Sequence, residues 1–269
     1  MRTKLPDVQN HEDNRGIELD KVGVTGLYYP LRIRDKANGI QNVTAKMDVL
    51  VGLHSRQRGA HFSHLVSALN KYKSKTFGMD NLVRLLREVR KKQDGEGMPF
   101  DSAYISISFK YFVEKTAPKS KLKSPVGYDC GFEISLNRPG YKCVIVNVPV
   151  STVCPCSKEI STKGAHNQRG IVTIKVKQKL TDSRIIWIED LISIAEESAS
   201  GEVYTLLRRV DEKHVTEDMF SHPTFVEDVV RNAVIGLKKR VKDVEYLVSC
   251  ENSESIHPHN AYAEVSGKC

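Results

Sequence analysis

Two stretches near the start of the chain alternate between apolar and polar residues, which is the pattern of a β-strand with one buried face. Every second residue from Leu27 to Ile33 is large and apolar, while Arg32 and Arg34 face the other way. The same alternation runs from Ala45 to Leu53. The chain is therefore expected to open with two strands that share an apolar face.

A helical period follows the second strand. Residues 62–73 predict one helix, and the apolar residues between Leu82 and Val89 predict a second that stops near Asp94-Gly95. Alternation returns at residues 103–109 and 132–136. The first half of the chain thus predicts the order ββααββ.

The same order recurs beyond a turn signal at Asn137-Arg138-Pro139-Gly140. It comprises strands at 144–150 and 172–176, helices near Asp190 and from Pro223, and strands near 245–250 and 261–266. We therefore predict an α+β protein of two tandem ββααββ units, with antiparallel sheets and helices on one face. The first unit, with an N-terminal extension, takes residues 1–138, and the second takes residues 139–269.

Composition is that of an ordinary globular protein, with 40% hydrophobic and 28% charged residues in a chain of 269. No run approaches the roughly 20 apolar residues of a membrane span, and the first residues do not resemble a secretory signal. The expected location is the cytoplasm. The six cysteines are then expected to stay reduced, which favours metal binding or catalysis over disulfides for the close pair Cys154 and Cys156.

A formal charge of +8 suits nucleic acid, a membrane surface or an anionic small substrate. Much of it lies in basic runs on helix faces, such as Lys238-Lys239-Arg240, which are usually solvated. Nucleic-acid binding favours aromatic residues among the basic ones, and the chain has a single Trp. A nucleic-acid-binding module is thus the weaker alternative, and neither nucleic acid nor membrane is the expected partner.

The densest chemical cluster runs from Cys154 to Arg169, in the link between two predicted strands. It holds thiols, an imidazole at His166 and cations at Lys158 and Arg169. A structural zinc site needs four protein ligands, whereas a catalytic one keeps three and leaves a position for water. Cys154 and His166 with one carboxylate from elsewhere suit the second type. Taken singly, each residue has an inert reading as a small hydrophobe or a hydrogen-bonded loop residue.

Three weaker clusters accompany it. His257 and His259 fall on one face if their segment is extended, as metal ligands, proton-transfer groups or incidental residues of a surface hairpin. Glu202 and Glu217 lie in acidic stretches that are usually solvated. Residues 57–64 stand at the start of a helix, where free N–H groups and cations can hold phosphates.

Together these stretches resemble the type IB GTP cyclohydrolase I family. The matching segments run in order through nearly the whole chain: DVQ from Asp7, GAHFS from Gly59, CPCSKEIS, GAHNQR, EVYTLLRRVDEKHVTE, PTFVEDVVR and ENSESIHPHNAYA. The resemblance implies the tunnelling fold in a homotetramer and the conversion of GTP to 7,8-dihydroneopterin triphosphate and formate, the first step of folate and pterin biosynthesis. An archaeal branch that yields a cyclic phosphate, or another tunnelling-fold enzyme acting on a purine or pterin, such as a reductase with Cys156 as its nucleophile, remains an alternative.

Residue by residue, the resemblance implies that Cys154, His166 and Glu202 hold one divalent metal ion per subunit, Zn first, with Mn or Fe also suited. Cys156 resembles a nearby second thiol, and His257 and His259 resemble the proton-transfer pair. Glu217 resembles the carboxylate that grips the guanine edge. The implied triphosphate contacts are His61, Ser63, Lys158 and Arg169. Gly201 and the Phe62-Ser63-His64 stretch depart from the usual family pattern, and the second departure bears on the phosphate contacts.

Assembly follows from strand count. Each predicted unit offers four strands, and eight are too few for a barrel that encloses a nucleotide. Closing the wall with strands of another subunit would place the sites at subunit boundaries. Glu217, His61 and Ser63 would then serve a metal held by a neighbouring chain.

Overall fold

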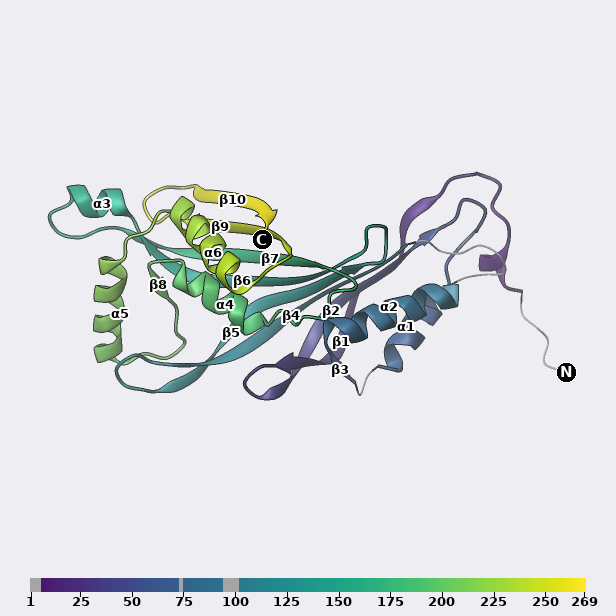
Figure 1. Cartoon of the computed structure of the whole chain (residues 1–269), viewed down its shortest axis with the longest axis horizontal. Coiled ribbons are helices and arrows are strands. Elements are labelled where there is room, and N and C mark those ends of the chain that lie inside the picture. The colour runs from purple at the N-terminus through teal and green to yellow at the C-terminus, as the bar shows by residue number, and fades with distance from the viewer. Residues whose placement is uncertain (1–5, 73–74, 94–101) are drawn as a thin grey trace. The chain divides into compact units, whose positions relative to one another are not determined.

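The computed structural model describes residues 6–72, 75–93 and 102–269. Within them the chain forms six α-helices and one ten-stranded, mostly antiparallel sheet (Figure 1). The strand order is β10-β9-β7-β6-β5-β4-β2-β1-β3, with β8 paired to β6 and a parallel step only between β1 and β3 in the printed pairings. The expected α+β class is thus confirmed.

Contacts divide the chain into two compact units, of which the first comprises residues 1–109, 131–143 and 179–183. It contains β1 (Leu19–Asp35), β2 (Gly39–Leu53), α1 (Phe62–Asn70), β3 (Thr76–Phe77) and α2 (Met79–Gln93), with parts of β4 (Ala103–Thr116) and β5 (Lys123–Ser135). The predicted ββααββ order is confirmed here, apart from the two-residue β3. The predicted helix end at Asp94-Gly95 lies outside the described residues.

The core of the first unit comes from the alternation itself. Leu31 and Ile33 of β1 and Met47 of β2 are almost fully buried, whereas Arg34 and Lys46 on the opposite face are exposed. Helices α1 and α2 contact each other and add a cluster of leucines at helical spacing, which is fully buried: Leu65, Leu69, Leu82, Leu85 and Leu86. Burial of this apolar surface is the main force that stabilises the unit.

The second unit comprises residues 110–130, 144–178 and 184–269. Its elements are the rest of β4 and β5, most of β6 (Tyr141–Val153), α3 (Pro155–Ile160), β7 (Asn167–Lys179), α4 (Ile188–Glu197), β8 (Gly201–Glu202), α5 (Arg209–Ser221), α6 (Val226–Arg240), β9 (Glu245–Ser253) and β10 (Asn260–Lys268). Helix α6 packs on α4, β9 and β10. The predicted strands and the two predicted helices are all present and in order.

Three elements of this unit were not predicted: α3, β8 and α5. Helix α5 has no apolar stripe, because Asp211 is its only buried residue, so its sequence lacks the signal of an amphipathic helix. Helix α6 begins at Val226 with Phe225 as its N-cap, three residues later than the predicted start at Pro223. Its acidic first turn and basic last turn are as predicted and match the helix dipole.

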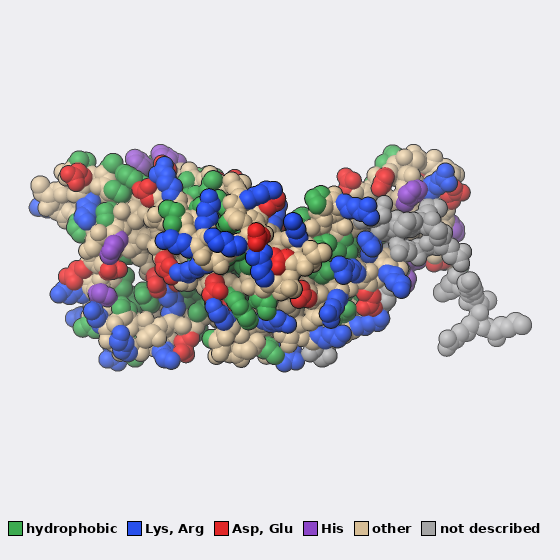
Figure 2. Space-filling model, in the orientation of Figure 1, with side chains coloured by type: hydrophobic (Ala, Val, Ile, Leu, Met, Phe, Trp, Pro, Cys, Tyr) green, Lys and Arg blue, Asp and Glu red, His purple; other side chains and the backbone are tan. Residues whose placement is uncertain are grey.

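Charges on the second unit are mixed rather than segregated. On the face shown in Figure 2, basic side chains lie over α4 and α6 with acidic ones among them. Arg240 pairs with Glu197 at 2.5 Å, and Arg231 pairs with Asp228 at 2.9 Å. This agrees with solvated helix faces.

Strands β4, β5 and β6 contribute residues to both compact units, and so does β7 through Lys179. The boundary between the two predicted tandem units, at residues 138 and 139, stays a prediction. In the part of the chain that the structure describes, no helix combines the length and the apolar character needed to cross a membrane.

Candidate functional site

Cys154 and His166 lie together where β6 ends and β7 begins. The backbone N–H of Cys154 donates to the carbonyl of His166 at 3.1 Å. Cys154 is also the N-cap of α3, and its Sγ accepts from the N–H of Ser157 at 3.4 Å. Ser157 closes the arrangement, because its Oγ accepts the N–H of His166 at 3.2 Å. Three local hydrogen bonds therefore hold a thiol and an imidazole at one place.

The sequence explains this turn. Pro155 stands at the first position of α3, where its fixed φ suits a helix start and its missing N–H costs nothing. A thiol in place of a hydroxyl at the N-cap accepts the same backbone hydrogen bond. The CPCS segment therefore ends the strand and starts the helix within a few residues.

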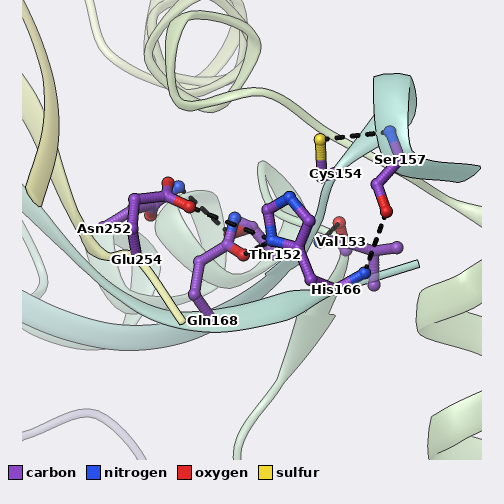
Figure 3. Close-up of polar contacts among 9 residues, drawn as sticks. Thr152, Val153, Cys154, Ser157, His166, Gln168, Asn252 and Glu254 are labelled. Carbon is purple, nitrogen blue, oxygen red and sulfur yellow. Dashed lines mark hydrogen bonds and ion pairs between the residues drawn. The ribbon is translucent and has the colours of Figure 1, made fainter. Parts of the chain in front are cut away.

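The imidazole of His166 is held on one side by polar groups of β7 and of the segment after β9. Its Nδ1 lies 3.1 Å from Oε1 of Gln168 and 4.0 Å from Oε2 of Glu254 (Figure 3). The side chains of His166 and Glu254 are only 18% and 11% exposed. The ring therefore has a defined orientation.

A buried polar contact joins two of the strands next to Cys154 and His166. Asn252 of β9 donates through Nδ2 to Oγ1 of Thr152 of β6 at 3.1 Å, and both side chains are buried (Figure 3). Gly170 of β7 permits that contact, because a Cβ there would lie 2.4 Å from Oδ1 of Asn252. The strands that carry the site are thus fixed to one another by side chains as well as by the sheet.

Glu202 lies in a different environment. Lys115 of β4 forms an ion pair with its Oε2 and also donates to Oε1 of Glu196 at 2.7 Å. Tyr128 donates to the same Glu196 oxygen at 2.7 Å, and the Lys115 ammonium lies 4.7 Å from the centre of the Tyr204 ring. Lys115 and Glu196 are about nine-tenths buried, whereas Glu202 is 39% exposed. One ammonium therefore serves two carboxylates.

Burial dominates the electrostatics of this cluster. It raises the pKa of Glu196 above its usual value, although Lys115 and Tyr128 stabilise the ionised form. Burial together with the neighbouring glutamates also raises the pKa of both Tyr128 and Tyr204. Both phenols therefore stay protonated and act as hydrogen-bond donors at neutral pH.

Two pockets of the second unit meet at Glu202. One has a volume of about 410 Å³ and is lined by Lys115, Tyr128, Glu196, Glu202 and Tyr204, among others. The other, of about 470 Å³, shares Glu196, Glu202 and Tyr204 with the first and adds His214, Asp218 and His222 of the α5 region. Glu202 thus borders spaces large enough for a small ligand.

Among the described residues, no three His, Cys, Asp or Glu side chains are close enough together to hold a metal ion. Cys154 and His166 are joined by a backbone hydrogen bond, whereas Glu202 is engaged by Lys115. The donor set itself fits a catalytic metal: one thiol, one imidazole and one carboxylate. The chain thus brings Cys154 and His166 together, whereas the third expected donor, Glu202, is paired with Lys115.

The two predicted proton-transfer histidines are neighbours on the connection between β9 and β10. The rings of His257 and His259 stack with centroids 5.0 Å apart and planes 12° apart, and both residues are exposed. Glu254 lies on the same connection. The pair is therefore open to solvent and joined by a short segment to the residue beside His166.

The remaining predicted residues of this unit have varied settings. Lys158 donates to the carbonyl of Phe220 at 2.6 Å and lies 4.6 Å from the centre of that ring, which ties α3 to the end of α5. Glu217 is 65% exposed and pairs with Lys213 at 3.7 Å. Cys156 and Arg169 are exposed. Among these four described residues, Lys158 alone has a side-chain hydrogen bond or ring contact that joins two elements.

His61 and Ser63 belong to the first unit, at the start of α1. Nε2 of His61 lies 3.2 Å from Oδ1 of Asn10 and 3.6 Å from Oδ2 of Asp7. Gln9 donates to the carbonyl of Ala60 at 2.9 Å, so the DVQ and GAHFS segments pack together. Ser63 is exposed. The predicted helix start is therefore correct, with His61 as its N-cap.

Sequence reasoning missed four side chains that hold these donors. Gln168 and Glu254 lie within the GAHNQR and ENSESIHPHNAYA segments, so their closeness in sequence to predicted site residues could have identified them. Lys115 and Glu196 had none, because they are separated by 81 residues and meet only through the fold.

Asp211 at the start of α5 is a further buried carboxylate. It accepts the backbone N–H groups of Lys119 and Ser120, both at 2.8 Å, and of Arg208 at 2.9 Å. Burial acts to raise its pKa, but these hydrogen bonds outweigh burial and hold the pKa below the usual range. The carboxylate fastens α5 to the turn that follows β4.

Solved structures of urate oxidases share the fold. A hyper-thermostable AgUricase variant matches with a TM-score of 0.52 and 8% identity, over 93% of this chain and 92% of that one. A highly active mutant of urate oxidase from Bacillus sp. TB-90 matches with a TM-score of 0.51 and 10% identity, over 93% of this chain and all of that one. At such low identity the likeness concerns the fold alone.

Sequence relatives are much closer. A family model described as "Type I GTP cyclohydrolase folE2" matches residues 5–263. The GTP cyclohydrolase FolE2 of Syntrophus aciditrophicus is 47% identical over 261 residues, which cover 96% of this chain and 98% of that protein. FolE2 of Dictyoglomus turgidum is 44% identical over 266 residues, with 97% of each chain covered. The chain therefore belongs to the type I GTP cyclohydrolase FolE2 family.

Proposed function

We propose that this chain hydrolyses GTP at C8, releases formate and closes a pterin ring to give 7,8-dihydroneopterin triphosphate, the entry to folate and pterin biosynthesis. In this proposal one divalent metal ion is held by Cys154, His166 and Glu202. Membership of the FolE2 family supports the reaction. The observation that carries the site is the backbone hydrogen bond that keeps a thiol and an imidazole together at the end of β6.

The three donors are of the kinds that suit a catalytic Zn ion, and Mn or Fe also accepts such a set. When bound, the metal supplies Lewis-acid activation of water for attack on the purine. Glu202 can join the other two donors only if it leaves or shares its contact with Lys115. Because Lys115 also pairs with Glu196, it keeps a counter-ion when Glu202 turns away.

His257 and His259 are the proposed proton-transfer pair. Imidazole titrates near neutral pH, so either ring can protonate a purine nitrogen as the C–N bond breaks. With ring centroids 5.0 Å apart, the two rings lie close enough to act on the same substrate.

Glu217 is the proposed anchor for the guanine edge, because one carboxylate can accept two N–H bonds from it. Its exposure leaves room for a ligand that is partly enclosed by another chain. We therefore keep the proposal of a tunnelling-fold homotetramer, with two tandem units per subunit and sites at subunit interfaces. Mixing inactive Cys154→Ala and Glu217→Ala subunits would restore activity if sites are shared, whereas a fully active monomer would contradict this assembly.

Glu217→Gln tests the anchor directly. The variant is expected to keep its metal and lose most of its activity toward GTP, because an amide presents an N–H where the guanine edge needs an acceptor. Metal content and initial rates measure the two effects separately. Loss of metal, or near-normal turnover, would speak against the role.

His61, Ser63, Lys158 and Arg169 remain the proposed triphosphate contacts. To bind a phosphate, Lys158 has to give up its hydrogen bond to the Phe220 carbonyl. In the same way, His61 has to give up its contacts with Asn10 and Asp7. The product's phosphate state therefore tests this part of the proposal. Mass spectrometry distinguishes the linear triphosphate from the cyclic phosphate of the archaeal branch.

The decisive experiment is to incubate the metal-loaded protein with GTP. The expected products are formate and, after oxidation, a fluorescent pterin in equal amounts. A thiol-dependent reductase of the same fold, with Cys156 as its nucleophile, would release no formate. Intact GTP after incubation with each of Zn, Mn and Fe would contradict the proposed reaction.

A further inference from the structure

A hydrogen-bond acceptor and a carboxylate face the same nitrogen of His166. Oε1 of Gln168 lies 3.1 Å from Nδ1, and a carboxylate oxygen of Glu254 lies 4.0 Å from it. An ionised carboxylate and an amide oxygen can only accept. A hydrogen on Nδ1 can be donated to Gln168, and it is attracted by the Glu254 carboxylate, which at 4.0 Å is an electrostatic neighbour. A neutral imidazole carries only one such hydrogen. The contacts therefore favour a lone pair on Nε2, the nitrogen that Figure 3 shows on the side of Cys154.

We propose that Gln168 and Glu254 are positioning residues that hold His166 as its Nδ1–H tautomer and aim Nε2 at the metal. The inference rests on the metal role proposed for His166. Histidines that bind metals in proteins usually donate their other N–H to a carboxylate or a carbonyl oxygen, which fixes both the tautomer and the ring orientation. Gln168 and Glu254 supply one acceptor of each kind.

Strand register places the two acceptors opposite each other. Arg169 pairs with Ser253, and Gly170 pairs with Asn252, in the antiparallel ladder of β7 and β9. One further step in the same register sets Gln168 against Glu254. Gln168 is only 8% exposed, and Asn252, two residues before Glu254, is locked to Thr152. Gln168 is therefore positioned by the sheet, and Glu254 directly follows the end of a strand that the sheet holds.

Glu254 also begins the segment that carries His257 and His259. Glu254, whose side chain faces His166, is thus the first residue of the proposed proton-transfer segment. A change at Glu254 is expected to act on metal binding and on that segment together. A change at Gln168 is expected to act on His166 alone, which makes Gln168 the cleaner site for a test.

The test compares three variants. Gln168→Met removes the acceptor at similar length, and Gln168→Glu keeps an acceptor there. Gln178→Met is the matched control, because Gln178 is a buried glutamine of the same strand, 3% exposed, that donates to the carbonyl of Arg184 at 3.1 Å. Two quantities are measured: the Zn affinity by chelator competition, and the tautomer of His166 in the metal-free protein by long-range ¹H–¹⁵N NMR. The His166→Gln spectrum assigns the signal among the nine histidines.

The wild-type protein and Gln168→Glu are expected to show the Nδ1–H tautomer and equal Zn affinity. In Gln168→Met the single tautomer is lost and Zn affinity falls by about 10–100-fold, the usual effect of removing an outer-shell partner. Gln178→Met is expected to lower the melting temperature and leave both quantities unchanged. If the loss of Zn affinity came only from a less stable fold, Gln178→Met would show it too.

An Nε2–H tautomer in the wild-type protein would overturn the inference, as would an unchanged affinity in Gln168→Met. The tautomer is read without metal and needs no variant in the acceptor positions, so it stands apart from the proposed function. Full Zn retention by His166→Gln would instead contradict the metal role of His166 itself.

Discussion

The two parts of the proposed metal site are built in different ways. Cys154 and His166 are held by three hydrogen bonds to backbone groups or to Ser157, all within one connection between strands. Glu202 is held by Lys115. Lys115 also pairs with Glu196, which accepts a hydrogen bond from Tyr128, and these residues come from distant parts of the chain. The first part rests on local geometry, and the second rests on buried charge. Local geometry is visible in a short motif, whereas a buried charge cluster exists only once the fold has formed.

Cys154→Ala removes the local part and is expected to have the largest effect. Its Sγ is both the proposed soft ligand and the cap of α3, so metal affinity should fall by more than the roughly 10–100-fold that an outer-shell change costs. Metal analysis of the purified variant measures this. Cys143→Ala, a change at a fully buried thiol of the first unit, is the control. Stoichiometric metal in Cys154→Ala would remove the ligand assignment.

Lys115→Met removes the shared cation of the distant part. Glu196 would then be buried without a positive partner, which typically costs about 3–5 kcal/mol of unfolding free energy. Urea unfolding at neutral pH measures the loss. The double variant Lys115→Met/Glu196→Gln should recover much of it, because an amide needs no counter-ion.

Lys123→Met serves as the comparison for that experiment. Lys123 pairs with Glu114 at 2.9 Å, but both side chains are more than half exposed. Its loss should therefore cost less than about 1 kcal/mol. Equal effects of Lys115→Met and Lys123→Met would show that burial does not govern the cluster.

Asp211 is a second buried charge, and its contribution to stability can be measured through the dependence of stability on pH. Its hydrogen bonds lower its pKa in the folded state, so its contribution to stability is fully present above the pKa of an unfolded aspartate, near ~4. The contribution is lost as the pH falls through the lower, folded pKa. Asp211→Asn should therefore destabilise the protein at pH 7 and flatten the acid limb of stability against pH. An unchanged slope below about pH 4 would contradict this account.

Lys158→Met is expected to have a small effect on stability. Its ammonium donates to a carbonyl in the last turn of α5, a contact that is typically worth about 0.3–1 kcal/mol. Metal binding should be retained, because Lys158 bonds to Cys154 only through its backbone N–H, which donates to the Cys154 carbonyl at 3.1 Å and is kept in the variant. Thermal unfolding against the exposed Lys163→Met control measures the difference. A marked loss of metal would mean that the local part of the site depends on α5.

The limits of sequence-based prediction follow the same division. Alternation predicted β1, β2 and their buried faces because every second side chain has to enter the core, as Leu31 and Met47 do. Helix α5 escaped, since it buries one aspartate and no apolar stripe. The closeness of Cys154 and His166 could be anticipated, because both lie in one short link between two predicted strands. The grip of Lys115 on Glu202 could not, because no local pattern links a residue of β4 to one of β8.

The hydrogen bond between Cys154 and the carbonyl of His166 closes the residues between them into a small loop with a fixed base. The far end of that loop, residues 159–163, is exposed, and Gly164 turns the chain back with a φ of 147°. Exposed loop ends generally tolerate inserted or altered residues when the backbone at the base stays bonded. A fluorescent probe attached at Thr162 should therefore sit beside the donors without displacing them. The fold thus offers a natural attachment point for watching metal and nucleotide arrive.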